Sequence, residues 1–366
     1  APGNWKRIVD TLGTGGSVNL SGASGSLDFD AASVIDVSPG AKGQTGRVSF
    51  GVARDASDQI GATRLAGTVL SRSGGRGDPA QVVLEAQRSY AAGGEVSAGD
   101  IAGYAADHAN FIASSSANGD AVNRFASLKA DGSVPAAARL QGATELRTTG
   151  DMNLAAAWDL TDGAWLAEGR AGTLTLRAGG NLTLRNSLGS PNDNLIDGDT
   201  WNLRLIGGAD LAAANPLATV AADAGGMGSL LLAGNNAKLR TGTGSIELAA
   251  ATDFKMDSAR SVIYTAGRVG AADTAVNGNN RWGRDGGSIS IAVGRDAIGE
   301  SNEWITEWLR RPRSAPPAVS AEWWVYRPNF QQGIGTLSGG DVRIDASRDV
   351  SRLSVMLPTT GRRNVD

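Results

Sequence analysis

Three stretches of the chain repeat one pattern that decides the predicted fold: GSIELAAATDF (residues 244–254), GSISIAVGRDAI (residues 287–298) and GDVRIDASRDV (residues 340–350). Each begins with Gly, continues with alternating aliphatic residues, passes through small residues and reaches an Asp before another apolar residue. Alternation with a period of two places the aliphatic side chains on one face of a β-strand. Small residues allow a sharp bend, and a short Asp side chain bonds readily to the backbone of a bend. Each stretch therefore predicts a strand, a corner and a second strand.

The same pattern recurs elsewhere: GSVNLSGASGSLDF (residues 16–29), GRVSFGVARDA (residues 46–56), GTLTLRAGGNLTL (residues 172–184) and WNLRLIGGADL (residues 201–211). The predicted corner residues, separated by 29, 43, 43 and 53 positions, are Asn181, Asp210, Asp253, Asp296 and Asp349. A parallel β-solenoid tolerates such irregular steps because each coil needs only to stack on its neighbour. A step of 43 could hold two coils, and GSLLLAGNNAKL (residues 228–239) would supply an extra one.

These repeats predict an all-β fold, a parallel β-helix that runs through residues 1–366 as a single segment. An antiparallel β-sandwich is the alternative. It would need two-residue hairpin signals between paired strands, and few are present. The β-helix is therefore the preferred interpretation.

Two insertions interrupt the repeats. The first, about residues 93–138, is rich in Ala, and its apolar spacing predicts short helices within 97–130, with Asp100 as a helix cap. The second, about residues 301–330, combines a predicted helix over 302–311 with a linker rich in Pro, Ser and Ala. Pro312 would end that helix.

Composition limits the chemistry that the chain can perform. It contains no Cys and one His, so thiol chemistry and metal sites built from His and Cys are excluded. A net charge of −3 gives no general reason to expect nucleic acid as a partner. His108 falls on the predicted Ala-rich helix and is interpreted as a packing or surface residue rather than a catalytic base. We expect no cofactor and no enzymatic activity.

Two groups of residues are candidate sites. The first group consists of three carboxylates, Asp193, Asp197 and Asp199. They are weak candidates for a Ca²⁺ site or a sugar-cleaving site. The alternative is that they form a polar turn. Rings in the second insertion are candidates for ligand binding, because aromatic faces stack on sugars; they are Trp304, Trp308, Trp323, Trp324 and Tyr326. The alternative is that these rings, together with Phe330, form a lid on the flank of the β-helix.

The C-terminal part resembles a region of filamentous-haemagglutinin-like exoproteins, which Gram-negative bacteria export by two-partner secretion. The stretches that carry the resemblance include GDTWNLRLIGGADLAAANP (residues 198–216), DGGSISIAVGRDAIG (residues 285–299) and EWWVYRPNFQQGIGTLSGGDVRIDASRDVSRLSVMLPTTGR (residues 322–362). The resemblance implies a right-handed parallel β-helix, export through an outer-membrane secretion partner, and a location in the secreted or cell-surface fraction. It carries no catalytic residues to this chain.

The resulting hypothesis is a structural or adhesive segment of a bacterial surface fibre, flanked by adjoining segments of a longer chain. Its expected partners are receptors on host cells, on other bacteria or on glycans. Two alternatives remain from the sequence: a polysaccharide-active enzyme on the same fold, and the stalk or receptor-binding part of a contact-dependent toxin-delivery protein.

Overall fold

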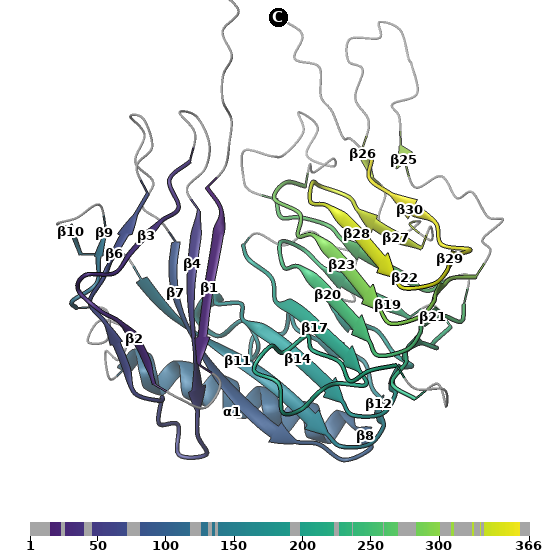
Figure 1. The fold of residues 1–366 in the computed structure, drawn as a ribbon, viewed down its shortest axis with the longest axis horizontal. Coiled ribbons are helices and arrows are strands. Elements are labelled where there is room, and N and C mark those ends of the chain that lie inside the picture. The colour runs from purple at the N-terminus through teal and green to yellow at the C-terminus, as the bar shows by residue number, and fades with distance from the viewer. Residues whose placement is uncertain are drawn as a thin grey trace, which may run out of the picture. The chain divides into compact units, whose positions relative to one another are not determined.

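The computed structural model describes residues 15–22, 26–39, 46–71, 81–117, 126–130, 134–135, 138–190, 198–222, 227–235, 237–258, 260–269, 283–300, 309–310, 324–325, 330 and 333–358. The chain divides into two compact units. Unit 1 comprises residues 1–88 and 110–143, and unit 2 comprises residues 89–109 and 144–366. Both are built mainly from parallel strands (Figure 1).

Unit 2 contains three parallel sheets that the chain visits in turn. The strands of the first sheet are the end of β11 (Ala138–Thr148), β14 (Thr173–Ala178), β17 (Asn202–Gly207), β20 (Ile246–Ala250), β23 (Ile289–Val293) and β28 (Val342–Ala346). The strands of the second are β8 (Glu95–Val96), β12 (Met152–Leu154), β15 (Leu182–Leu184), β18 (Leu230–Leu232), β21 (Phe254–Met256), β24 (Ala297–Ile298) and β29 (Val350–Ser351). The strands of the third are β13 (Trp158–Asp159), β16 (Leu188–Gly189), β19 (Lys238–Thr241), β22 (Val262–Thr265), β27 (Ile334–Thr336) and β30 (Val355–Met356).

The order of these strands makes unit 2 a parallel β-helix. One coil consists of β20, β21 and β22, the next of β23, β24 and β27, and the last of β28, β29 and β30. Equivalent positions stack without slippage, since Leu248 pairs with Ile291, which in turn pairs with Ile344. The fold predicted from the repeats is confirmed.

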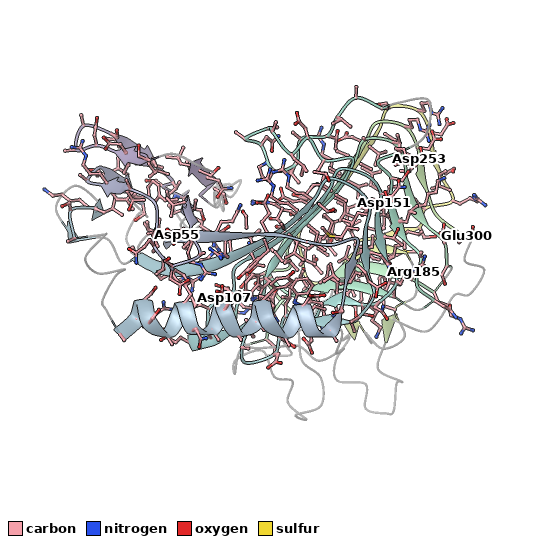
Figure 2. The ribbon with its side chains drawn as sticks, turned by 90° about the horizontal axis from the view of Figure 1, so that it is seen from below. Asp55, Asp107, Asp151, Arg185, Asp253 and Glu300 are labelled. Atoms are coloured by element: carbon pink, nitrogen blue, oxygen red, sulfur yellow. The ribbon has the colours of Figure 1, made fainter. Side chains whose placement is uncertain are left out.

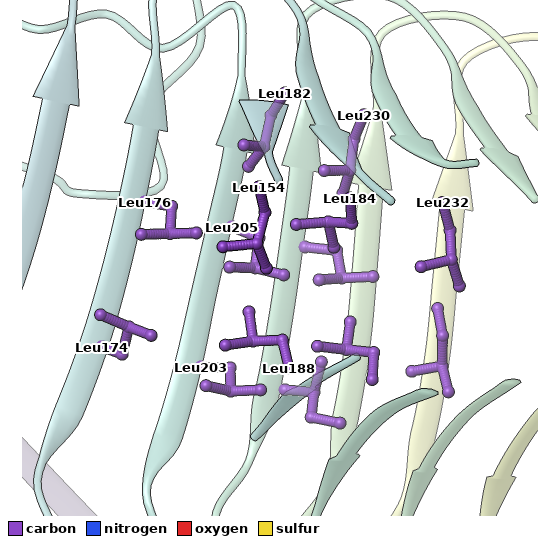
Figure 3. Packing of buried hydrophobic residues seen from close by; sticks show 14 of the residues in the cluster. Leu154, Leu174, Leu176, Leu182, Leu184, Leu188, Leu203, Leu205, Leu230 and Leu232 are labelled. Carbon is purple, nitrogen blue, oxygen red and sulfur yellow. The ribbon is translucent and has the colours of Figure 1, made fainter. Parts of the chain in front are cut away.

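The interior of the coils is filled mainly with aliphatic side chains (Figure 3). Buried Leu residues from successive strands lie in rows, among them Leu174, Leu176, Leu203, Leu205, Leu230 and Leu232. Burying one such side chain stabilises a fold by about 1.5–3 kcal/mol. Since every coil contributes equivalent positions, the alternating pattern of the sequence becomes a continuous core.

Unit 1 uses shorter and less regular elements. Its parallel strands are β1 (Ser17–Gly22), β4 (Arg47–Arg54) and the first part of β7 (Gln81–Ala91), together with β2 (Leu27–Phe29) beside β5 (Thr63–Leu65). A further sheet joins β3 (Val34–Asp36), β6 (Thr68–Leu70), β9 (Lys129–Ala130) and β10 (Val134–Pro135), the last pair antiparallel. The rings of Phe29 and Phe50 lie 5.4 Å apart in its core.

Two expectations about coil number and corners are wrong. The stretches 201–211 and 228–239 belong to one coil, because β17 continues into β18 and β19 after an excursion whose described part is residues 208–222. Asp210 lies in that excursion, and Ser229 is the residue that precedes β18. The 43-residue steps therefore contain one coil each, lengthened outside the strands, because only the strands must keep register.

The helical predictions are partly confirmed. Helix α1 (Ala98–Ala117) forms, and the described residues beyond it at 126–130 are a turn and strand β9 rather than helix. Its N-terminus is a reciprocal cap in which Asp100 N donates to Ser97 Oγ (3.3 Å) and Ser97 N donates to Asp100 Oδ2 (2.9 Å). The 3₁₀ helix η1 (Ala167–Gly169) was not predicted.

The helix predicted over residues 302–311 is contradicted at its end. Leu309–Arg310 form strand β25, which pairs antiparallel with β26 (Trp324–Val325). Backbone pairing with a distant segment overrides the helical spacing of the local sequence. Residues 302–308 lie outside the described part of the chain.

Candidate functional surface

Asp199 is linked through Arg268 to Asp285, which lies far from it in the sequence. Arg268 Nη1 lies 3.5 Å from Asp199 Oδ1, and Arg268 Nε donates to Asp285 Oδ2 at 2.9 Å. The backbones of Arg268 and Arg284 also exchange two hydrogen bonds, of 2.8 and 2.9 Å. Both carboxylates are therefore ion-paired through one guanidinium group. The other two acidic candidates, Asp193 and Asp197, lie outside the described residues.

This arrangement differs from that of a hydrolytic or metal site. Paired catalytic carboxylates face each other across room for a sugar, whereas Asp199 and Asp285 share Arg268. In the described part of the chain, no three His, Asp or Glu side chains gather as metal ligands. The contacts of Asp199 are those of a bond between neighbouring loops.

His108 belongs to a buried aromatic cluster. Its ring lies 5.6 Å from Trp165 and 5.0 Å from Trp201, measured between centroids. Trp201 Nε1 donates to the carbonyl oxygen of Trp165 at 2.9 Å. Tyr104 of α1 stacks on Trp158, with centroids 6.2 Å apart. His108 is thus a packing residue within unit 2, where it lies against the rings of Trp165 and Trp201.

The aromatic candidates of the second insertion are mostly outside the described residues, namely Trp304, Trp308, Trp323 and Tyr326. Trp324 is placed as part of strand β26. Phe330 is buried, and its ring lies 5.2 Å from Tyr264 on β22, at an edge-on angle of 64°. Val262 and Leu337 share this small cluster. A ring of this insertion therefore covers the flank of the third sheet, as the lid interpretation predicts for Phe330.

A column of polar side chains links successive coils at the corner between the first and second sheets. Asp253 accepts two hydrogen bonds from Arg295, of 3.1 and 2.7 Å, and one of 3.3 Å from the backbone N–H of Asp296. Asp296 repeats this arrangement one coil later, with Arg348 and the backbone N–H of Asp349. Figure 2 labels Asp253 in this column.

Asn and Asp play the same part in earlier coils. Asp151 Oδ1 accepts from Asn181 N at 2.7 Å, and Asn181 Oδ1 accepts from Gly228 N and Ser229 N. The corner residues were expected to bond within their own turn. Asn181, Asp253 and Asp296 bond instead to the next coil. Asp210 does bond within its own turn, where it accepts from Ala212 N at 3.0 Å. The recurring Arg-Asp pair in GRDAI and SRDV is the sequence signal that could have revealed this.

Two acids of the column are held in their charged form. Burial disfavours the charge of Asp253, but hydrogen bonds from Arg295 and from Asp296 N–H outweigh it, so the pKa of Asp253 lies below its ordinary value. The side-chain hydrogen bond from Arg348 likewise lowers the pKa of Asp296. Charge in this column therefore stabilises the stacking of coils.

A buried ion pair lies on the outer face of the first sheet. Arg177 Nη1 is 3.2 Å from Glu145 Oε1, with side chains 5% and 4% exposed, and Ser89 Oγ donates to Glu145 Oε2 at 2.5 Å. Arg177 also donates to the carbonyl oxygen of Asp210, and Arg147 donates to that of Leu211. The excursion after β17 thus covers these charges and supplies acceptors for them. Sequence reasoning missed this network because its members are far apart in the chain.

The last coil differs from those before it in its exposure. Val342, Ile344 and Ala346 are only partly buried, although the aligned Ile289, Ile291 and Val293 belong to the core. Three of the seven exposed large apolar side chains of the described residues lie in this coil or directly after it: Val350 (54%), Val355 (37%) and Leu357 (52%). The far edge of β28 has no neighbour among the described strands.

Comparison of the sequence with models of protein families, with curated proteins and with solved structures found no match. No helix in the described part of the chain is both long and apolar enough to cross a membrane.

Proposed function

We propose that the chain is a structural and adhesive segment of a secreted bacterial surface fibre. The observation that carries this proposal is the parallel β-helix of unit 2, in which each coil stacks on the next in register. Such a fold is extended by adding coils, so it separates its ends by a distance that grows with chain length. The resemblance of the C-terminal part to filamentous-haemagglutinin-like exoproteins agrees with this use of the fold.

The distribution of polar groups also supports a structural role. Charged side chains are used to join neighbouring coils, as in Asp253 with Arg295, or to hold an excursion, as in Arg177 with Asp210. The interior is occupied mainly by aliphatic and some aromatic side chains, which leaves the outer surface and the insertions to make external contacts. Rings of the second insertion other than the buried Phe330 would contact a glycan or a cell surface.

The test is attachment of beads that carry the purified chain to epithelial monolayers, to Gram-negative cells and to a glycan array. We expect attachment under flow to at least one of these surfaces. Trp323→Ala and Trp308→Ala test the aromatic insertion, and Val34→Ala, an exposed change in unit 1, is the matched control. Absence of attachment by the folded chain to all three surfaces would contradict the adhesive proposal.

Two outcomes separate adhesion from its alternatives. Loss of attachment with an unchanged melting temperature in the Trp variants would assign binding to the rings, whereas a lowered melting temperature would assign them to a lid. Release of sugar products from pectin or alginate, abolished by Asp199→Asn, would replace adhesion by a polysaccharide-active enzyme.

A further inference from the structure

The exposed edge of β28 has a self-complementary sequence. Val342, Ile344 and Ala346 point toward the core, and Arg343 and Asp345 point outward. In the sequence VRIDA, the basic Arg343 precedes Ile344 and the acidic Asp345 follows it, so reversing the strand direction places an acidic residue where a basic one was. In an antiparallel pair of two such strands centred on Ile344, each Arg343 therefore lies opposite Asp345 of the other strand. Opposite charges at facing positions stabilise an antiparallel pair.

The hydrogen bonds that β28 already makes fix which groups remain at the edge. Ile289 N donates to the carbonyl oxygen of Asp341 (2.8 Å), and Ser347 N donates to that of Val293 (3.1 Å). Because bonding in a parallel sheet alternates along each strand, the peptide groups of Val342, Ile344 and Ala346 point away from β23. These are the residues that would exchange hydrogen bonds in an antiparallel pair centred on Ile344.

The same geometry places the charges where they interact best. In antiparallel sheets the pairs that do not exchange hydrogen bonds have the closer side chains. With Ile344 at a hydrogen-bonded position, Arg343 and Asp345 occupy these closer positions. In the single chain they already bond to each other at 2.6 Å, so the two copies would form a ring of four alternating charges.

We propose that two copies of this chain associate through the last described coil, with a two-fold axis that passes midway between Ile344 of one β28 and Ile344 of the other. The partner's coil then runs in the opposite sense, so that β29 of one copy faces β30 of the other. This brings together Val350, Val355 and Leu357, the exposed apolar side chains of that coil. An isologous interface of this kind closes on itself and does not propagate.

The experiment is sedimentation of the full 366-residue chain over a range of concentrations. A monomer–dimer equilibrium is expected for the parent chain. Two single variants test the charge pairing, Arg343→Asp and Asp345→Arg. In a dimer of either variant, both pairs of facing residues at positions 343 and 345 carry like charges. Each variant should therefore weaken the dimer at least about tenfold. The double variant R343D/D345R restores the complementary order and should restore the dimer.

Mixing the two single variants is the sharpest arm of this experiment. In a mixed dimer the carboxylate introduced by R343D faces the guanidinium introduced by D345R, and the unchanged Asp345 of the first variant faces the unchanged Arg343 of the second. A mixed dimer should therefore form although neither variant dimerises alone. Arg204→Asp is the matched control, because it breaks the outward pair with Glu247 inside the same sheet and leaves the edge untouched. Circular dichroism establishes that every variant is folded.

Three results would overturn the proposal. They are a parent chain that stays monomeric at all concentrations, a dimer that ignores both single substitutions, and a dimer that is weakened by them but not restored by mixing. The last result would indicate parallel stacking or another register. A further check uses the absence of Cys: Ile344→Cys should form a disulfide between copies, since the paired Cα atoms lie about 5.5 Å apart, and Ala346→Cys should not.

Discussion

The coil formed by β23, β24 and β27 and the coil formed by β28, β29 and β30 have nearly the same sequence pattern but different environments. Ile291 is fully buried, whereas Ile344, stacked directly on it, is only partly buried. Asp253 and Asp296 bond to the coil that follows them, whereas Asp349 is exposed in the last described coil. Whether a side chain in this fold is buried and hydrogen-bonded therefore depends on the coil that stacks on it, and not on its own sequence alone.

The largest effect is expected for Ile291→Asp. Its carboxylate would be unpaired between Leu248 and Ile344, which should cost about 4 kcal/mol or more of unfolding free energy. Ile344→Asp should cost clearly less, because water reaches that side chain. Urea denaturation of dilute protein measures both. Equal losses would mean that Ile344 is covered in solution.

A smaller difference is expected for the corner column. Asp253→Ala removes the acceptor of Arg295 and of the backbone N–H of Asp296, and should lower the free energy of unfolding by about 1–3 kcal/mol. Asp349→Ala is the matched change at the last coil and should stay within about 0.5 kcal/mol of the parent. Similar losses for the two variants would show that Asp349 has a partner of its own.

Acid should weaken the column before it affects uncharged contacts. The folded-state pKa values of Asp253 and Asp296 are lowered, so their stabilising contribution is present above the unfolded-state pKa near 3.9 and is lost as pH falls below it. Unfolding free energies measured between pH 6 and about pH 2 should therefore decline, and Asp253→Asn should flatten that decline. An unchanged slope in the variant would contradict a charged column.

The smallest effect on the single chain is expected for Arg343→Asp. Its side chain is exposed and its partner Asp345 lies two residues away on the same strand. Exposed ion pairs contribute little to stability. The urea midpoint of dilute R343D should match that of the parent, which separates its effect on association from an effect on folding. A lowered midpoint in dilute protein would show that Arg343 contributes to the fold itself.

The fold was predictable because its signal is local and repeated. Alternation around Ile246, Ile289 and Val342 predicts strands, and the small residues after them predict corners. The predicted number of coils was wrong at Asp210, because the sequence of a long excursion resembles that of an extra coil. The prediction of a helix at Leu309–Arg310 was wrong because strand β25 is formed by pairing with Trp324 and Val325, which are distant in the sequence.

The candidate sites were less predictable for the same reason. Asp199 was recognisable as part of a polar turn, but only the folded chain places Arg268 between it and Asp285. His108 was interpreted as a packing or surface residue, and its burial beside Trp165 and Trp201 confirms packing. The Arg177–Glu145 pair has no local pattern, because its residues come from strands of different coils.

The excursion between β17 and β18 has a practical consequence. It lengthens one coil while Leu203 still pairs with Ile246 and Leu230 still pairs with Phe254. The number of residues between two strands of a coil can thus increase without changing how those strands pair with the neighbouring coils. Ala214 is an exposed residue of the excursion, so a foreign peptide inserted near it should lie on the outside of the coils. The molecule could therefore serve as a scaffold for peptide display.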